Sequence, residues 1–117
     1  MEIETTLLPI IKVSTNEIYA GVHWRKRRKI KQDYLLVTRS KIRSIPKIEG
    51  KVNLSFSFYF KSRPLDSSNC SFMAKMIEDC LVGNGILKDD SIKHVGKISI
   101  ESYKGTEDYC KMKIESA

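Results

Sequence analysis

The 117-residue sequence has few cysteines, no long apolar run and none of the common nucleotide-binding or hydrolase motifs. Its longest apolar stretches, such as Leu7 to Ile11, are far shorter than the ~20 residues that a membrane-spanning helix requires. Residues 1–4, Met-Glu-Ile-Glu, carry acids where a secretory signal carries basic residues, and no apolar segment of signal length follows them. We therefore expect a cytoplasmic protein that neither spans a membrane nor is exported.

The three cysteines and two histidines exclude several further kinds of site. Cys70, Cys80 and Cys110 form an odd set without a C-x-x-C pair, so the sequence indicates neither a disulfide framework nor a zinc ribbon. His23 and His94 lack a partner at the spacing of a metal site or a catalytic triad. We expect reduced, mostly buried thiols and structural histidines.

No P-loop, G-x-G-x-x-G or G-x-S-x-G motif is present, and the sequence contains no internal repeat and no low-complexity linker. Nothing therefore indicates a small-molecule cofactor. The length is that of one module, so we predict a single domain over residues 1–117.

The charge balance is strongly positive, with 21 Lys and Arg against 14 Asp and Glu and a net charge of +7. Such an excess suggests a polyanionic partner, either nucleic acid or an anionic membrane. Most of it lies in one segment, opposed only by Asp33, which contains Arg25, Lys26, Arg27, Arg28, Lys29, Lys31, Arg39, Lys41, Arg43 and Lys47. Several such side chains on phosphates would bind a nucleic-acid backbone without reading bases, whereas the alternative is a solvated helix face. Trp24, Tyr19 and Tyr34 lie nearby as stacking surfaces or as core residues.

The hydrophobic pattern predicts an α+β fold, with a small mixed sheet and two packed helices in the order β-α-β-α-β-β. Strands are expected at residues 2–13, with Pro9 marking an edge strand or a bulge near the middle, and at 52–60, where apolar and polar residues alternate. Residues 14–23 are expected to form a capping cluster and then a loop. A basic helix is expected at 24–43, and an amphipathic helix at 72–82 that follows a polar loop at 61–69. Two antiparallel strands are expected at 92–103 and 109–114, joined by a turn at 105–108.

Acidic side chains flank the second predicted helix. Asp66 precedes it and Asp89-Asp90 follows it, while Lys75 and Asp79 lie one turn apart on its polar side. Carboxylate oxygens suit Mg²⁺, which takes only a few ligands from a protein, and a bound metal ion would promote hydrolysis of a phosphodiester. The alternatives are that Asp66 caps a helix, that Asp89-Asp90 fills a turn, and that Lys75 and Asp79 form a surface salt bridge.

This part of the chain resembles the RusA-type Holliday junction resolvases, metal-dependent endonucleases of bacteria and phages. The segment Lys75-Met-Ile-Glu-Asp79-Cys-Leu81 is similar to the family's K-x-x-x-D-x-L helix. Gly85-Ile-Leu-Lys-Asp89-Asp90-Ser91, with Val95 downstream, is similar to the Gly-to-Asp-Asp segment that follows that helix in the family. Ser14-Thr15-Asn16, with Tyr19 downstream, resembles the family's N-terminal Ser-x-Asn segment.

The resemblance implies a Mg²⁺ site, with Mn²⁺ as a substitute, held by acids of a D-x-D-N motif and by the second Asp of the Asp-Asp pair. Asp90 matches that second Asp, and Lys75 matches a lysine that assists phosphodiester hydrolysis. Asp66-Ser67-Ser68-Asn69 departs from D-x-D-N, because Ser68 replaces an acid and one extra helical turn precedes Lys75. If the helix starts one turn earlier than in the family, the extra turn keeps the helix phase and Asp66 and Asn69 occupy the metal site. If the sequence is instead aligned to the family motif without a gap, Asn69 and Ser71 stand at the acidic positions.

The candidate site that follows from the resemblance has catalytic, metal-binding and DNA-binding parts. The catalytic residues are Asp66, Lys75 and Asp90; the metal ligands are Asp66 and Asp90, with Asn69 and Asp89 as further ligands and Asp79 as support; the DNA-binding residues are Asn16, Arg25, Lys26, Arg27, Arg28, Lys29 and Lys31.

The implied partners are four-way junction DNA and a second copy of the chain, because a twofold dimer places two identical sites on two strands. The function expected is resolution of Holliday junctions by paired, symmetric phosphodiester hydrolysis. Two alternatives stay open: a junction-binding protein of the same fold with impaired cutting, or a basic module that binds RNA or protein.

Overall fold

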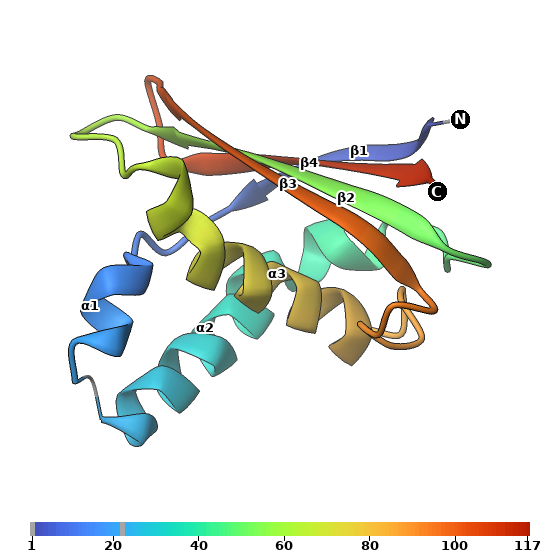
Figure 1. Ribbon diagram of the computed structural model, residues 1–117, viewed down its shortest axis with the longest axis horizontal. Helices are drawn as coiled ribbons and strands as arrows, with labels where there is room; N and C mark the ends of the chain where they lie inside the picture. Colours follow the sequence, from blue (N-terminus) through green and yellow to red (C-terminus); the bar gives the residue numbers. More distant parts are fainter. Residues whose placement is uncertain (1, 22) are drawn as a thin grey trace.

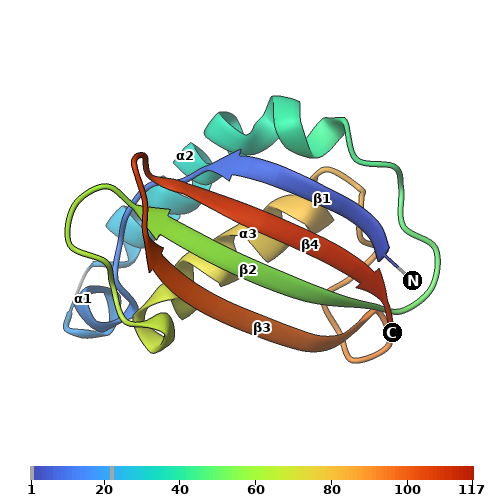
Figure 2. The same ribbon diagram turned by 90° about the horizontal axis from the view of Figure 1, so that it is seen from above.

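A computed structural model describes residues 2–21 and 23–117 as an α+β fold, in which one face of a mixed four-stranded sheet is covered by helices (Figures 1 and 2). The elements are β1 (Glu2–Pro9), α1 (Thr15–Tyr19), α2 (Trp24–Arg43), β2 (Val52–Phe60), the 3-10 turn η1 (Ser67–Cys70), α3 (Ser71–Gly83), β3 (Val95–Lys104) and β4 (Tyr109–Ser116). The predicted α+β class with a small mixed sheet is confirmed, and α1 and the turn η1 are present in addition to the two helices that were predicted.

The central strand β2 has the bounds that its alternating sequence predicts. On the open face of the sheet, Asn53, Ser55 and Ser57 are partly exposed. The side chains between them point to the helices and are buried: Val52, Leu54, Phe56, Phe58 and Phe60. A strand with a two-residue period buries one whole face, which explains why this prediction is correct.

The sheet order is β1-β4-β2-β3, and β2 pairs with β3 in parallel and with β4 in antiparallel register. The last two strands run antiparallel and are joined by a short turn, as predicted, but they do not pair, because β2 lies between them (Figure 2). The turn crosses the end of β2, where the Gly105 N–H donates to the Phe60 carbonyl at 2.8 Å. A Cβ at Gly105 would lie 3.1 Å from the Tyr59 Cβ, so the close crossing favours glycine.

Strand β1 lies at an edge of the sheet, as the presence of Pro9 predicts, and among the described strands it pairs with β4 alone. The strand ends at Pro9 and does not continue to residue 13. Its register shift lies between Glu2 and Glu4, so the bulge is at the start of the strand and not at the proline.

The helices pack together under the sheet (Figure 1). Helix α2 has its predicted bounds and buries Tyr34, Thr38 and Ile42, which are four residues apart and share one face. Helix α3 buries most of its length, and all three cysteines are buried free thiols, as expected. Among the described residues, no helix is both long and apolar enough to cross a bilayer.

The short helix α1 was not predicted, since residues 14–23 were expected to be a capping cluster and a loop. Ser14 caps it with a capping box, in which the Ser14 side chain accepts from the Glu17 N–H and the Glu17 side chain accepts from the Ser14 N–H. The capping signal was therefore present in the sequence, but it starts a helix of only one turn.

Candidate nucleic-acid interface

The first half of α2 projects its basic side chains into solvent. The His23 side chain caps the helix by accepting from the Arg25 N–H at 3.1 Å. Every side chain from Trp24 to Lys29 is exposed, and the buried residues of the helix begin only at Tyr34. This half of α2 is therefore a charged surface whose sequence the core does not dictate.

A groove of about 380 Å³ separates this surface from α3. It is lined by Trp24, Arg27, Arg28 and Lys31 from α2 and by Phe72, Lys75, Met76 and Asp79 from α3. Three of the predicted DNA-binding residues thus share one concave surface with two predicted site residues of α3, Lys75 and Asp79. Their positive charges can bind successive phosphates of one strand without base contacts.

The other predicted DNA-binding residues lie outside this groove. Lys29 forms an ion pair with Asp33 at 2.7 Å, and the Arg25 guanidinium lies 5.4 Å from the centre of the Trp24 ring. Lys26 is exposed. Asn16 is on α1, where its backbone N–H donates to the Asn69 Oδ1 at 3.1 Å.

Three carboxylates converge on the Lys75 ammonium at one end of the groove; we call Lys75, Glu78, Asp79 and Asp90 the Lys75 cluster. The Lys75 Nζ donates to the Asp90 Oδ2, and it lies 3.2 Å from the Asp79 Oδ1 and 3.6 Å from the Glu78 Oε1. Lys31 joins the groove to this cluster, because its Nζ lies 3.7 Å from the Asp79 Oδ2. The predicted residues Lys75, Asp79 and Asp90 are therefore brought together.

Helix geometry and one turn build the cluster. Lys75, Glu78 and Asp79 are three and four residues apart on α3, so their side chains lie on one face of the helix. Asp90 comes from the segment after α3, which turns back at Gly85, where φ is +75°. The Asp89 side chain accepts from the Asp90 N–H at 2.7 Å, so Asp89 shapes the backbone beside the cluster.

The contacts within the cluster, together with burial, shift the pKa values of its side chains. The hydrogen bond to Asp90 raises the pKa of Lys75, and the same hydrogen bond lowers the pKa of Asp90. Burial raises the pKa of Glu78, although the nearby Lys75 charge opposes this shift. At neutral pH the cluster therefore holds a charged lysine against an ionised Asp90.

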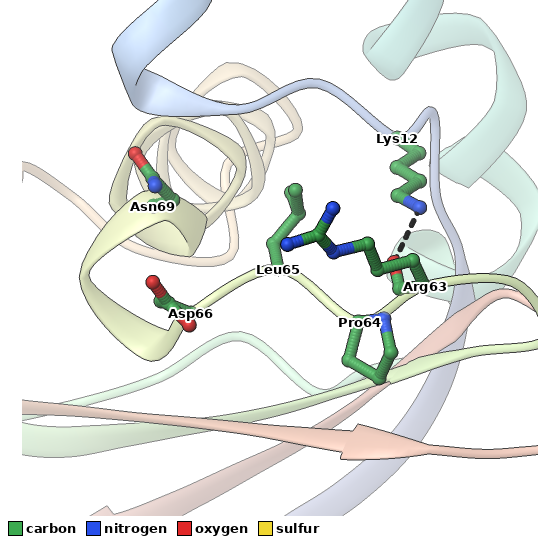
Figure 3. Close-up of a pocket in the computed structure, with 6 residues that line it drawn as sticks. All are labelled: Lys12, Arg63, Pro64, Leu65, Asp66 and Asn69. Carbon is green, nitrogen blue, oxygen red and sulfur yellow. Dashed lines mark hydrogen bonds between the residues drawn. The ribbon is translucent and has the colours of Figure 1, made fainter.

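Asp66 and Asn69 lie in a different pocket, of about 310 Å³, which Figure 3 shows together with Lys12 and Arg63. The Lys12 Nζ donates to the Arg63 carbonyl at 2.7 Å on the far side of this pocket. A helical turn, η1, does precede α3, as the alignment with Asp66 requires. Asp66 nevertheless precedes the four residues of η1 and the first turn of α3, and it lines this pocket and not the groove that Lys75 lines.

The alternative alignment places Asn69 and Ser71 at the acidic positions, and both contact α1. The Asn69 carbonyl accepts from the Thr15 hydroxyl at 3.1 Å, and the Ser71 Oγ lies 2.9 Å from the Thr15 Oγ1. The Thr15 Oγ1 also accepts from the Phe72 N–H at 2.8 Å. These two residues thus join the Ser-x-Asn segment to the start of α3.

Sequence reasoning missed Glu78 and the contact of Lys31 with Asp79. Glu78 is only 5% exposed, an unusual position for a carboxylate, and its spacing of three residues from Lys75 was the available signal. The contact between Lys31 and Asp79 depends on how α2 crosses α3, which no local pattern reveals.

The oxygen atoms of the Lys75 cluster are of the type that divalent cations such as Mg²⁺ prefer as ligands. Asp79 and Asp90 offer carboxylate oxygens from two segments, and both already contact one cation, the Lys75 ammonium. Within residues 2–21 and 23–117, no three His, Cys, Asp or Glu side chains are grouped as a ready metal site. Mg²⁺ usually takes only one or two carboxylates and completes its shell with water and substrate phosphates, so two carboxylates suffice.

The groove thus places three basic side chains of α2 beside a cluster that contains carboxylates of α3 and of the segment after it. Comparison of the chain with models of known protein families and with curated protein sequences finds no match.

Proposed function

We propose that this protein is a metal-dependent endonuclease of the RusA type, which resolves four-way DNA junctions. The observation that carries the proposal is the groove between α2 and α3, whose basic wall leads to the Lys75 cluster. A phosphodiester bound along that wall would lie next to Lys75, Asp79 and Asp90.

The chain's own residues bind and position the strand. Arg27, Arg28 and Lys31 neutralise phosphates along the groove that leads to the reacting one, and the arginines can contact phosphate oxygens with two N–H groups at once. Because these contacts are to the backbone, they select the shape of the DNA and not its bases.

Asp79 and Asp90 would hold Mg²⁺ or Mn²⁺, which when bound supplies Lewis-acid polarisation of the scissile phosphate. The Lys75 ammonium then exchanges its contact with Asp90 for one with the phosphate. There it stabilises the negative charge that develops on the leaving oxygen. The raised pKa of Lys75 keeps the ammonium charged for this role at neutral pH.

Paired cuts on opposed strands need two such sites, so we propose a homodimer acting on one junction. We place this activity in the cytoplasm, where three buried free thiols stay reduced. In this proposal the reaction needs no small-molecule cofactor.

One observation favours a second candidate, a junction-binding protein that does not cut. Asp66 lies outside the Lys75 cluster, and Ser68 stands where the family motif has an acid. If the reaction needs both acids at one metal site, the groove would still bind DNA while hydrolysis would fail.

Cleavage of a labelled four-way junction, beside a linear duplex of equal length, separates these candidates. We expect symmetric nicks in the junction with Mg²⁺ or Mn²⁺, none with EDTA, and none with Asp90→Asn. The matched control is Asp33→Asn, which removes an acid from the same basic surface but outside the cluster and should leave cutting intact. Tight junction binding without cutting in either metal would support the second candidate.

The variant Asp66→Asn then tests the role of the separate pocket. Loss of metal-dependent cutting would show that Asp66 acts in the reaction despite its position. Unchanged cutting would restrict the site to Lys75, Asp79 and Asp90.

A further inference from the structure

Trp24, the single tryptophan of the chain, is 53% exposed on the wall of the groove. Trp24 is not one of the aromatic residues that fill the core, because those that are fully buried lie on β2 and in the second half of α2. An exposed tryptophan beside a cluster of arginines is costly to leave in water and is typical of a binding surface.

The surroundings of Trp24 define the kind of ligand. The His23 ring centre lies 5.6 Å away at an angle of 31°, and the Arg25 guanidinium lies 5.4 Å from the Trp24 ring centre. Arg27 and Arg28 line the groove beside the indole. An aromatic ring next to phosphate-binding charges is the combination that holds unpaired nucleotides, since a base stacks on the ring while its phosphate meets a cation.

The spacing along α2 relates this ring to the Lys75 cluster. Lys31, which contacts Asp79 at 3.7 Å, is seven residues after Trp24, which is about 10 Å along the helix. In duplex DNA a strand advances about 3.4 Å per nucleotide, so this distance corresponds to about three stacked nucleotides, and to fewer where the strand is extended.

We propose that Trp24 stacks on a base that lacks a stacked neighbour, within about three nucleotides of the phosphate bound at the Lys75 cluster. The position of that phosphate rests on the proposed function. In an intact duplex both faces of every base are covered by neighbouring pairs, so Trp24 finds a partner only where this stacking is interrupted, as in a single strand or at the centre of a junction. The groove thereby discriminates branched or single-stranded DNA from linear duplex.

Intrinsic fluorescence tests this contact directly, because all tryptophan emission comes from Trp24. The full-length protein is titrated in EDTA, so that no cleavage occurs, with a single-stranded oligothymidine, a blunt duplex of equal length and a four-way junction. We expect strong quenching at saturation by the single strand, clear quenching by the junction and little by the duplex. Equal quenching by bound single strand and bound duplex, or none with either, would overturn the proposal.

Affinity measurements on variants provide the second readout. If a base stacks on Trp24, Trp24→Ala should weaken the binding of single-stranded DNA by about 5- to 150-fold and change the binding of duplex DNA little. Trp24→Phe keeps an aromatic ring and should retain most of the affinity for single-stranded DNA. Leu36→Ala is the matched control, because Leu36 is a 64% exposed apolar residue of the same helix outside the groove. An equal loss for single strand and duplex in Trp24→Ala would contradict stacking.

These outcomes are independent of cutting. Quenching by single-stranded DNA in a protein that does not cleave junctions would refute the endonuclease and leave the stacking site standing. Junction cleavage without quenching would refute the stacking site alone.

Discussion

Thr15 joins two helices through one hydroxyl group. Its Oγ1 accepts from the Phe72 N–H at 2.8 Å, whereas Cys70, at the N-cap position of α3, provides no side-chain cap. A residue of α1 therefore caps α3 from outside. We predict that Thr15→Val, which keeps the shape but removes the hydroxyl, lowers the free energy of unfolding by about 1 kcal/mol in a urea titration.

Thr15→Ser is the matched control for this prediction, because it keeps the hydroxyl and should retain most of the stability. Equal stability of the valine variant and the wild type would mean that water caps the Phe72 N–H equally well.

The buried thiols make the fold sensitive to alkali. Burial raises the pKa of Cys70, Cys80 and Cys110, and burial likewise raises the pKa of the Tyr34 hydroxyl. The unfolded chain releases thiol protons near pH 8.5, while the folded chain keeps them, so proton release favours unfolding. The contribution to stability is complete below that pH and is lost as the pH rises toward the folded-state pKa values.

We therefore predict that the free energy of unfolding falls above about pH 8.5, by up to about 1.4 kcal/mol per pH unit for each thiol still protonated in the folded state. Urea titrations under reducing conditions from pH 7 to 10 measure this slope. Cys110→Ala should be less stable at pH 7 but should show a shallower slope. An unchanged slope in that variant would exclude Cys110 as a source.

At the scale of elements, the two halves of α2 differ in what they contact. The first half borders the groove, whereas the second half packs into the core through Tyr34, Thr38 and Ile42. We predict that joint alanine substitution of Arg27, Arg28 and Lys31 lowers the slope of log affinity against log salt by about 0.9 for each lost phosphate contact, as measured on junction DNA by anisotropy.

The matched control removes the same charge from the other end of α2, by joint alanine substitution of Arg39, Lys41 and Arg43, which are also exposed. It should change the salt slope less. Equal effects of the two triple variants would show that net charge, and not the groove, governs binding.

Sequence reasoning succeeded where an element depends on local pattern. The bounds of α2 and β2 follow from periodicity within each segment. It failed where long-range packing decides. The separation of β3 from β4 by β2, the burial of Glu78 and the distance of Asp66 from Lys75 all depend on how distant segments meet.

At the scale of the whole molecule, the last strand in the sequence, β4, is an interior strand of the sheet. Strand β4 pairs with β1 on one side and with β2 on the other, and Cys110, Met112 and Ile114 are fully buried on its inner face. Among the described strands, β1 has no other partner. The four-stranded sheet is therefore incomplete without β4, because β4 alone joins β1 to the β2–β3 pair among the described strands.

We predict that chains ending at Lys104 or at Asp108 do not unfold cooperatively, because they lose the buried face of β4 and leave β1 unpaired. Thermal unfolding followed by far-ultraviolet circular dichroism, with amide hydrogen exchange of β1, measures this. The matched control, Lys111→Ala, keeps the strand and changes only an exposed side chain on the open face, so it should unfold cooperatively. A cooperative transition with protected β1 amides in the chain ending at Asp108 would contradict the prediction, since β1 would then need another partner.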